Sequence, residues 1–100
     1  MTISKKKTTS YRNLLHKNLQ DPEYAAEYLN AAIEDGDEKV FLLALRDVAE
    51  ARGIAQVASE ANLNRESTYR MLSKQGNPSL SSLWAVLDTL GLRLHFEPKA

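Results

Sequence analysis

Arginine, lysine and amide side chains gather between residues 56 and 77, and these residue types contact DNA bases and phosphates. Arg can donate two hydrogen bonds to guanine, Asn can pair with adenine, and Glu can accept from cytosine. We therefore expect Arg65, Glu66 and Arg70 to read bases. The further candidates are Asn64, Ser67 and Tyr69 for bases or phosphates, and Gln56, Lys74, Gln75 and Asn77 for phosphates. Phosphate contacts fix the register of a protein on DNA but carry little sequence information.

Two short helices joined by a tight turn, expected over residues 54–60 and 65–74, would position these side chains. The first helix needs a small residue where the second crosses it, and Ala58 fits. The turn needs a residue that tolerates positive φ, and Asn62 occupies that place. In a helix-turn-helix of this kind, the N-terminal part of the second helix reaches base edges in the major groove.

The second helix must also bury one stripe. Thr68, Met71 and Leu72 recur at three- and four-residue intervals and are expected to point inward, which leaves the polar residues outside. The alternative is that the polar residues merely solvate a helix face. Glu66 and Arg70 are four residues apart, so they could form an ordinary surface ion pair.

Helices are also expected on both sides of this pair, over residues 11–19, 22–35, 38–52 and 79–90. Asp21 followed by Pro22 is a strong helix start, and glycines end three of these helices. Apolar residues at helical spacing, including Leu80 and Trp84 in the last helix, are expected to face one core. The predicted fold class is mostly α: a five- to six-helix repressor-type (lambda-repressor-like) domain over residues 11–98.

The last part of the chain alternates apolar and polar side chains over residues 92–97, which predicts one C-terminal β-strand. An isolated strand leaves its backbone groups unpaired, so we expect it to pair with the same strand of a second copy across a two-fold axis. The expected dimer interface comprises Leu92, Leu94, Phe96 and Trp84, within a dimerising segment over residues 79–97. The alternative is a strand that lies on its own domain, or a frayed tail.

Charge is strongly segregated although the net charge is zero. Residues 1–19 carry five bases and no acid, residues 20–50 carry nine acids against two bases, and residues 51–100 carry six bases against four acids. Residues 1–10 lack periodicity and are expected to form a flexible basic arm, which either aids solubility or contacts DNA. A neutral chain can still bind DNA, because the field that matters is local.

Catalysis and metal binding have little support in the sequence. The chain has no Cys, and His16 and His95 lie far apart, so neither a disulfide nor a metal site is expected. No cofactor is expected. No apolar run approaches the roughly 18 residues that span a bilayer, and no signal peptide is recognisable. The cytoplasm is therefore the expected compartment.

Three segments resemble the addiction-module antidote family, the HigA-like antitoxins: YLNAAIEDGD at residues 28–37, FLLALRDVAEARG at 41–53 and NRESTYRML at 64–72. The similarity covers about residues 20–98. It implies a DNA-binding antitoxin that represses its own operon and neutralises a RelE/ParE-like (HigB-like) toxin. Relatives often carry a second Gly after the position of Gly53, which this chain lacks.

The resemblance suggests a partner for the acidic segment, because RelE-like toxins are expected to be basic. Glu34, Asp35 and Glu38 cluster around one helix junction and are candidates to face such a toxin. The alternative is helix capping and a solvated face. Two other functions remain open: a prophage-type repressor without a toxin partner, and a protein-interaction module on a helix-turn-helix scaffold. A DNA-binding homodimer would read a palindromic operator in double-stranded DNA.

Overall fold

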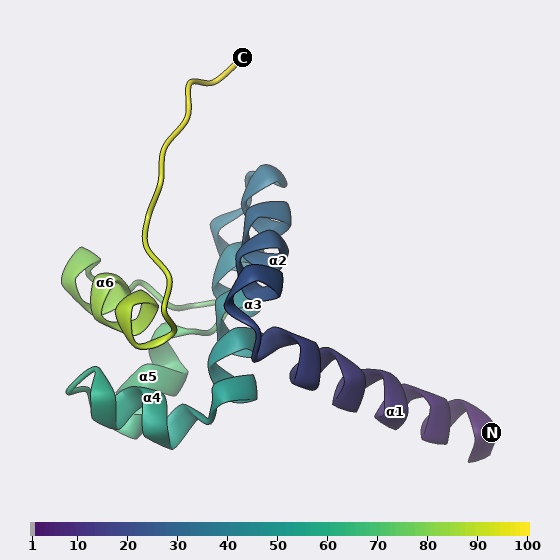
Figure 1. Ribbon diagram of the computed structural model, residues 1–100. Coiled ribbons are helices and arrows are strands. Elements are labelled where there is room, and N and C mark those ends of the chain that lie inside the picture. The colour runs from purple at the N-terminus through teal and green to yellow at the C-terminus, as the bar shows by residue number, and fades with distance from the viewer. Residues whose placement is uncertain (1) are drawn as a thin grey trace.

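The structure is a computed structural model that describes residues 2–100, with side chains described from residue 11 onward. This part of the chain forms six helices: α1 Thr2–Leu19, α2 Pro22–Glu34, α3 Glu38–Arg52, α4 Ile54–Glu60, α5 Arg65–Met71 and α6 Leu80–Thr89. In Figure 1, α2 and α3 lie side by side, and α4, α5 and α6 gather on one side of α3. None of the described helices combines the length and the hydropathy needed to cross a membrane. The prediction of a mostly helical fold is confirmed.

Local capping chemistry sets the starts of the two long central helices. The carboxylate of Asp21 accepts a hydrogen bond from the backbone N–H of Glu23 at 3.1 Å, and Pro22 takes the first helical position. Asp37 accepts in the same way from the N–H of Lys39 at 2.9 Å. Each cap satisfies a donor that the first helical turn leaves without a partner, so the starts expected from the sequence are confirmed.

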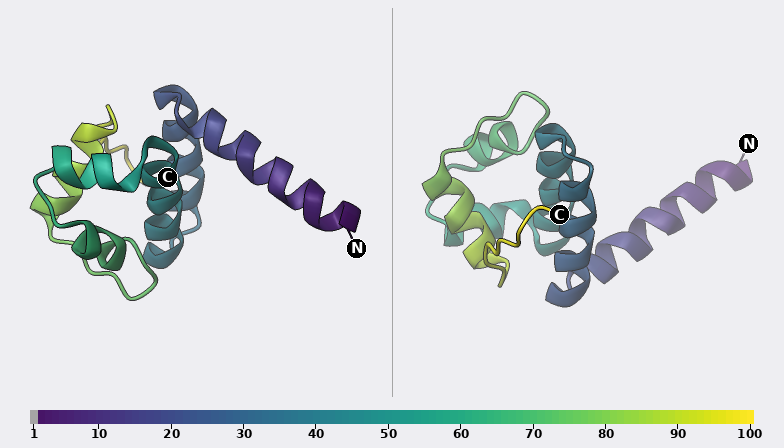
Figure 2. Two further views of the ribbon diagram at one scale, coloured as in Figure 1. Left: turned by 90° about the horizontal axis from the view of Figure 1, so that it is seen from below. Right: turned by 90° about the horizontal axis from the view of Figure 1, so that it is seen from above.

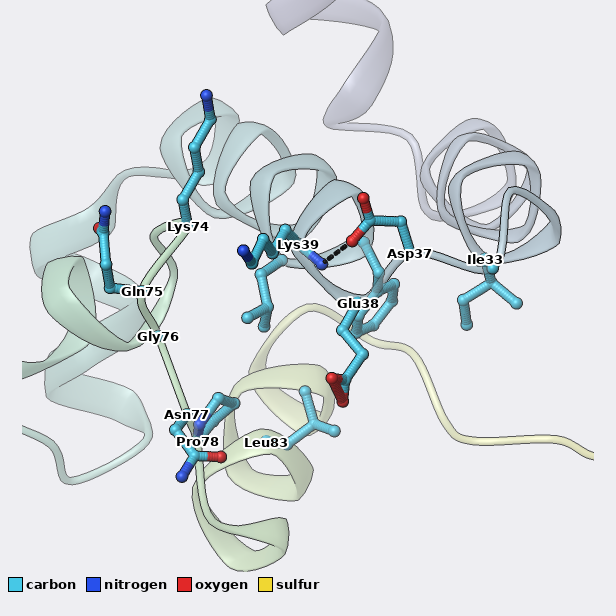
Figure 3. Close-up of a pocket in the computed structure, with 13 residues that line it drawn as sticks. Ile33, Asp37, Glu38, Lys39, Lys74, Gln75, Gly76, Asn77, Pro78 and Leu83 are labelled. Atoms are coloured by element: carbon cyan, nitrogen blue, oxygen red, sulfur yellow. Dashed lines mark hydrogen bonds between the residues drawn. The ribbon is translucent and has the colours of Figure 1, made fainter.

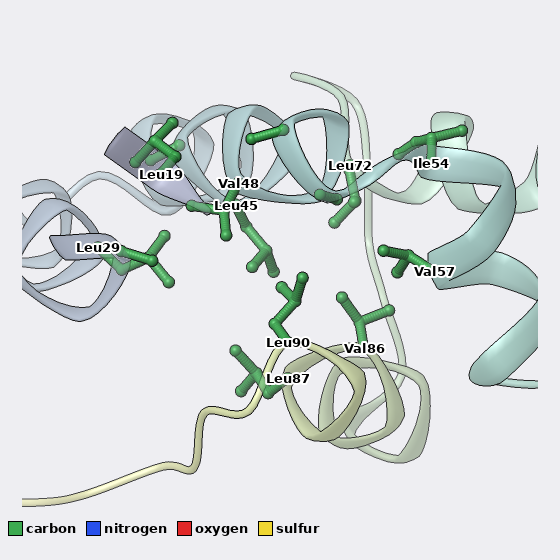
Figure 4. Packing of buried hydrophobic residues seen from close by; sticks show 14 of the residues in the cluster. Leu19, Leu29, Leu45, Val48, Ile54, Val57, Leu72, Val86, Leu87 and Leu90 are labelled. Atoms are coloured by element: carbon green, nitrogen blue, oxygen red, sulfur yellow. The ribbon is translucent and has the colours of Figure 1, made fainter. Parts of the chain in front are cut away.

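The apolar face of α3 is the centre of the core. Leu45 and Ala49 of α3 are fully buried, with exposed fractions of 0%. Leu45, Val57 of α4 and Val86 of α6 turn toward a common interior in Figure 4. Leu72, which directly follows α5, is buried in the same cluster. Removing these apolar surfaces from water is the largest favourable contribution to folding.

The orientation of α6 differs from the expectation. Leu80 and Trp84 do not face the core, because their exposed fractions are 64% and 58%. The buried stripe instead contains Val86 and Leu87, with Leu83 half-buried at its edge. Apolar residues surround much of this helix, so their spacing alone does not select one stripe. Contact with α4 and the rest of the core decides which side is buried.

The first helix is longer than expected and extends away from the rest of the molecule (Figure 2). It begins at Thr2, so the expected start at Tyr11 is wrong, and the backbone of residues 2–10, the expected flexible basic arm, is helical. This run contains no Gly or Pro, the two residue types least favourable inside a helix. A role of the lysine side chains of this run in DNA binding lies outside the described residues.

The last turn of α1 anchors this helix on the body. Leu19 is buried, and the side-chain amide of the following Gln20 donates to the carbonyl of Ala51 at 3.0 Å. Leu15, one turn earlier, packs half-buried against the core, whereas the neighbouring Leu14 is 56% exposed. The attachment of α1 therefore depends on its C-terminal end, where α1 meets α2 and α3.

The expected strand over residues 92–97 does not form in the described chain. Residues beyond α6 leave the body as an extended tail without regular structure (Figure 1). Leu92 and Leu94 pack half-buried against the core, whereas Phe96 is 87% exposed. A strand needs a neighbouring strand for its backbone hydrogen bonds, and the rest of the described chain is helical. The alternating pattern thus produces an extended tail in the single chain.

A hydrogen bond between side chains joins α2 to α3. The hydroxyl of Tyr28 donates to Oδ2 of Asp47 at 2.7 Å. Partial burial, together with the neighbouring Asp47 carboxylate, disfavours the phenolate and raises the pKa of Tyr28 well above its ordinary value. The folded protein therefore holds this proton more tightly than the unfolded chain does.

We expect the free energy of unfolding to fall as pH rises above about 10, the ordinary pKa of tyrosine. Because the pKa of Tyr28 is raised in the folded state, its contribution to stability is complete below about pH 10 and is lost as pH rises toward the folded pKa. Tyr28→Phe should flatten this slope, and Tyr24→Phe on the same helix should keep it. Urea unfolding between about pH 8 and 11 measures both. Equal slopes for the wild type and Tyr28→Phe would contradict this account.

Candidate nucleic-acid interface

Asn62 shapes the turn between α4 and α5. Its φ is 59°, in the left-handed region that Asn adopts more readily than most side chains. The N–H of Asn62 donates to the carbonyl of Ser59 at 3.1 Å, and the N–H of Leu63 donates to the carbonyl of Ala58 at 2.8 Å. These bonds occupy carbonyls that the end of α4 would otherwise leave unpaired. The expected positive φ at Asn62 is confirmed.

The two helices meet through small and buried residues. Ala58 of α4 and Thr68 of α5 are buried, with exposed fractions of 2% and 0%. The hydroxyl of Thr68 donates to the carbonyl of Asn64 at 2.8 Å, so this buried polar atom has a partner. Leu72 is fully buried and Met71 is half-buried. The inward stripe expected for α5 is therefore present, and it fixes which side of α5 faces outward.

The outward side of α5 carries the predicted base-reading residues. Arg65, Glu66, Ser67 and Arg70 are all exposed. Within the part of the chain that the structure describes, no ion pair joins Glu66 to Arg70, although their spacing would allow one. This face therefore presents two guanidinium groups and one carboxylate to solvent, and each can form hydrogen bonds with base edges.

Asn64 has a structural task at the start of α5. Its Oδ1 accepts from the backbone N–H of Glu66 at 2.8 Å and from that of Ser67 at 3.2 Å. Pairing with adenine would require this oxygen as well as the amide nitrogen. The geometry therefore makes Asn64 the N-cap that fixes the first turn of α5, where the candidate base-reading side chains begin.

Tyr69 lies between α5 and α3 rather than on the outer face. Its ring is half-buried against the core, and the Arg46 guanidinium carbon lies 5.1 Å from the ring centroid. Arg46 also contacts Glu50 through an ion pair of 3.5 Å. This cation–π contact ties α5 to α3. The spacing along the chain gives no signal for it, because the two residues belong to helices separated by α4.

The predicted phosphate-binding residues lie on two elements. Lys74, Gln75 and Asn77 are exposed in the loop after α5, and Gln56 is exposed on α4, where its amide donates to Glu60 at 3.2 Å. The loop therefore places one ammonium and two amide side chains directly beyond the C-terminal end of α5. Such groups suit the phosphate backbone.

Gly76 allows the loop to pass close to the end of α5. A Cβ at this position would lie 1.9 Å from the carbonyl oxygen of Met71, a distance that real atoms do not tolerate. The N–H of Gly76 donates to the carbonyl of Ser73 at 2.9 Å. The course of the loop that carries Lys74 therefore depends on the absence of a side chain at residue 76.

The other residues predicted to lie on functional surfaces belong to other elements. Glu34, Asp35 and Glu38 are exposed at the α2–α3 corner, and Glu38 lines one cavity together with Lys74 (Figure 3). Trp84 is exposed on α6 and Phe96 in the tail. Among residues 11–100, no group of His, Asp and Glu side chains is arranged to hold a metal ion. The structure thus brings the loop after α5 next to the acidic corner, a proximity that the sequence does not predict.

We expect Asn62→Val to destabilise the protein by about 1–2 kcal/mol, because a β-branched side chain is strained at positive φ. Asn62→Gly should cost little or stabilise slightly, since Gly adopts this conformation freely. Urea unfolding of the three proteins measures the difference. Equal stabilities for the Val and Gly variants would show that the φ of residue 62 does not constrain the turn.

Gly76→Ala should displace the loop after α5, because the new methyl group would collide with the backbone of Met71. We expect chemical shifts of residues 71–78 to change and unfolding to become easier by about 1–3 kcal/mol. Gly36→Ala is the matched control: nothing lies within 4 Å of its Cβ position, so only the strain of its φ of 78° remains. A Gly76→Ala variant with unchanged chemical shifts in this loop would refute the proposed close approach.

Comparison with known proteins identifies the family of this chain. A family described as "Probable addiction module antidote protein" matches residues 10–98 of the chain. A protein of Haemophilus influenzae (strain Rd), described as uncharacterized, is 32% identical over 81 residues, which are 81% of this chain and 84% of the relative. No solved structure matches the chain significantly. An antidote implies a toxin partner of some kind. The match spans the C-terminal half of α1, the helices α2 to α6 and the tail up to residue 98, and the chain belongs to the family of probable addiction module antidote proteins.

Proposed function

We propose that this antidote is a sequence-specific DNA-binding antitoxin that represses its own operon and neutralises a small, basic RelE/ParE-like (HigB-like) toxin. In this proposal, α4 and α5 form a helix-turn-helix in a repressor-type domain, and α5 enters the major groove. The observation that carries the proposal is the outward face of α5, where Arg65, Glu66 and Arg70 are exposed while Thr68 and Leu72 are buried on the inward side. The family supplies the toxin partner, and the geometry of α5 supports the DNA partner.

The proposed DNA contacts follow from the position of each residue on α5 or beside it. Arg65 and Glu66 occupy the first turn of α5, the part of a recognition helix that reaches base edges, and Arg70 lies one turn later. Asn64 and the Arg46–Tyr69 contact hold this helix in position. Ser67 is exposed beside Glu66 and contacts a base or a phosphate. Gln56, Lys74, Gln75 and Asn77 contact phosphates on either side of the groove.

The proposed antitoxin acts as a homodimer on a palindromic operator. Trp84 and Phe96 are exposed apolar side chains of a kind that protein interfaces commonly bury, and Leu92 and Leu94 in the tail are half-buried. Covering them with a second copy would remove their apolar surface from water. Two copies would present two α5 helices, and half-sites about 34–36 Å apart, or a multiple of this, would fit them. The acidic corner with Glu34, Asp35 and Glu38 is the proposed toxin-facing surface.

Binding to the promoter DNA of its own operon, measured by fluorescence anisotropy, tests the DNA part of the proposal. Arg65→Ala and Arg70→Ala should each weaken binding by about 1–3 kcal/mol, and most at the base that each reads. Lys74→Ala should instead weaken binding to all sequences alike and flatten its salt dependence, because only a phosphate contact is lost.

Three results would redirect this proposal. Identical behaviour of the Arg and Lys variants would show that the division between base and phosphate contacts is wrong. Toxin binding without any sequence-specific DNA binding would favour a protein-interaction module on the same scaffold. DNA binding without a toxin gene beside this gene would favour a prophage-type repressor.

A further inference from the structure

The projecting part of α1 leaves large side chains uncovered. Only the C-terminal end of α1 reaches the body, where Leu15 and Leu19 pack with the core. Tyr11 and Leu14 are three residues apart and therefore share one side of the helix, and they are 69% and 56% exposed. Helices shorter than about 12–15 residues are marginal in water unless an apolar side packs against something. The projecting turns of α1 would therefore be stabilised by a surface outside their own chain.

The charges of α1 and α2 determine which surface suits α1. Five bases and no acid lie in α1, whereas α2 contains three acids and no base. Two α1 helices side by side would repel each other, and so would two α2 helices, but α1 and α2 attract each other. Charge therefore favours a contact between α1 and α2.

A single chain does not use this attraction. The helix α1 leaves the body at its junction with α2 and extends away from it (Figure 2). Arg12 of α1 and Glu23 and Glu27 of α2 are exposed. Among residues 11–100 the ion pair that forms is Arg46 with Glu50, within α3. Glu23 and Glu27, one turn apart on α2, thus remain available to a basic helix from a second copy.

A small hollow on α2 adds a site for a cationic side chain. It has a volume of about 250 Å³ and is lined by Tyr24, Glu27 and Tyr28. In addition to burial and Asp47, neighbouring Tyr11 and Tyr24 raise the pKa of Tyr28, so Tyr11 of α1 lies near the same place. Aromatic rings attract cations, and a carboxylate beside them adds an opposite charge. The hollow therefore suits the end of a Lys or Arg side chain.

Two other partners fit α1 less well than a second copy does. The proposed toxin is basic, so α1 would repel it. DNA would attract α1, but α1 extends from one side of α2 and α3 while α4, α5 and α6 lie on the other (Figures 1 and 2). The proposed DNA-reading helix α5 is therefore on the far side of the body from α1.

We propose that two copies of this chain exchange their α1 helices across a two-fold axis, so that α1 of each copy lies on the acidic side of α2 of the other. The exchange covers Tyr11 and Leu14 and places a base of α1 in the hollow beside Glu27. Because the contact is reciprocal, it forms twice in each pair. It lies apart from the contact proposed through Trp84 and Phe96, so the two contacts together join more than two copies. It concerns the free protein and goes beyond the proposed DNA and toxin partners.

Sedimentation velocity of the full chain, without DNA or toxin, measures this self-association. Every chain, including the reference chain, carries Trp84→Ser, which removes a large apolar side chain of the other proposed contact. Lys5→Glu with Arg12→Glu reverses charges of α1, and Glu23→Lys with Glu27→Lys reverses charges of α2. Each double variant should self-associate about tenfold or more weakly than the reference chain, because like charges then face each other. An equimolar mixture of the two double variants should associate again, since each α1 then meets an α2 of opposite charge.

A matched control separates this contact from an effect of net charge. Lys39→Glu with Lys99→Glu changes the net charge as much as the α1 reversal does, but both residues are exposed outside α1 and α2. This control should self-associate like the reference chain and should not restore full association to the α2-reversed chain. Raising the salt concentration from about 0.05 to 0.5 M should weaken association of the reference chain, because salt screens exposed charges. Circular dichroism verifies that each variant is folded.

Several outcomes would overturn the inference. Reversed chains that self-associate like the reference chain, a mixture of them that stays dissociated, or a monomeric reference chain would each reject the exchange. Loss of operator affinity with unchanged self-association in the α1-reversed chain would make α1 a phosphate-binding element, and loss of toxin affinity alone would make it a toxin contact. A wild type that binds neither operator nor toxin would remove the proposed function, whereas the exchange would stand.

Discussion

Burial of one apolar face of α3 is the interaction on which the placement of the other helices depends. Leu45, Val48 and Ala49 are almost completely removed from water, and α1, α2 and α4 all contact α3. Without that face, neither short helix of the α4–α5 pair could be stable, because helices of this length are marginal in water. Packing against the large apolar surface around α3 therefore stabilises α4 and α5, which are too short to be stable alone.

A second constraint acts within the α4–α5 pair, where the turn and the buried residues together fix the orientation of α5. The positive φ of Asn62 brings α5 back across Ala58, and burial of Thr68 and Leu72 then decides which side of α5 faces outward. The Asn64 cap fixes the first turn of α5. The exposed arginines are therefore held on a rigid support, which reduces the conformational entropy that binding would otherwise cost.

The molecule places its acidic corner and its basic loop on two sides of one cavity. Glu38 and Lys74 are far apart in the sequence, yet both line the space beside Leu83. One short loop therefore forms a wall of the cavity and also carries side chains of the kind that contact phosphates.

The sequence by itself determined the helical fold class, the starts of α2 and α3, the turn at Asn62 and the outward polar residues of α5. These features depend on local chemistry: Asp caps, glycine and asparagine at positive φ, and the 3.6-residue repeat of the helix. The sequence also carried the motifs of the antidote family.

Only the tertiary structure decided which side of α6 is buried and that Tyr69 contacts Arg46 of α3. It also decided where the acidic corner lies relative to the loop after α5. Leu80 and Trp84 looked as apolar as Val86, and contact with α4 selected Val86. The capping role of Asn64 and the contact of Tyr69 with Arg46 likewise depend on groups that come together in space. The tail with its alternating sequence forms no strand in the described chain. Alternation can give a strand one apolar and one polar face, but the backbone hydrogen bonds of a strand require a neighbouring strand.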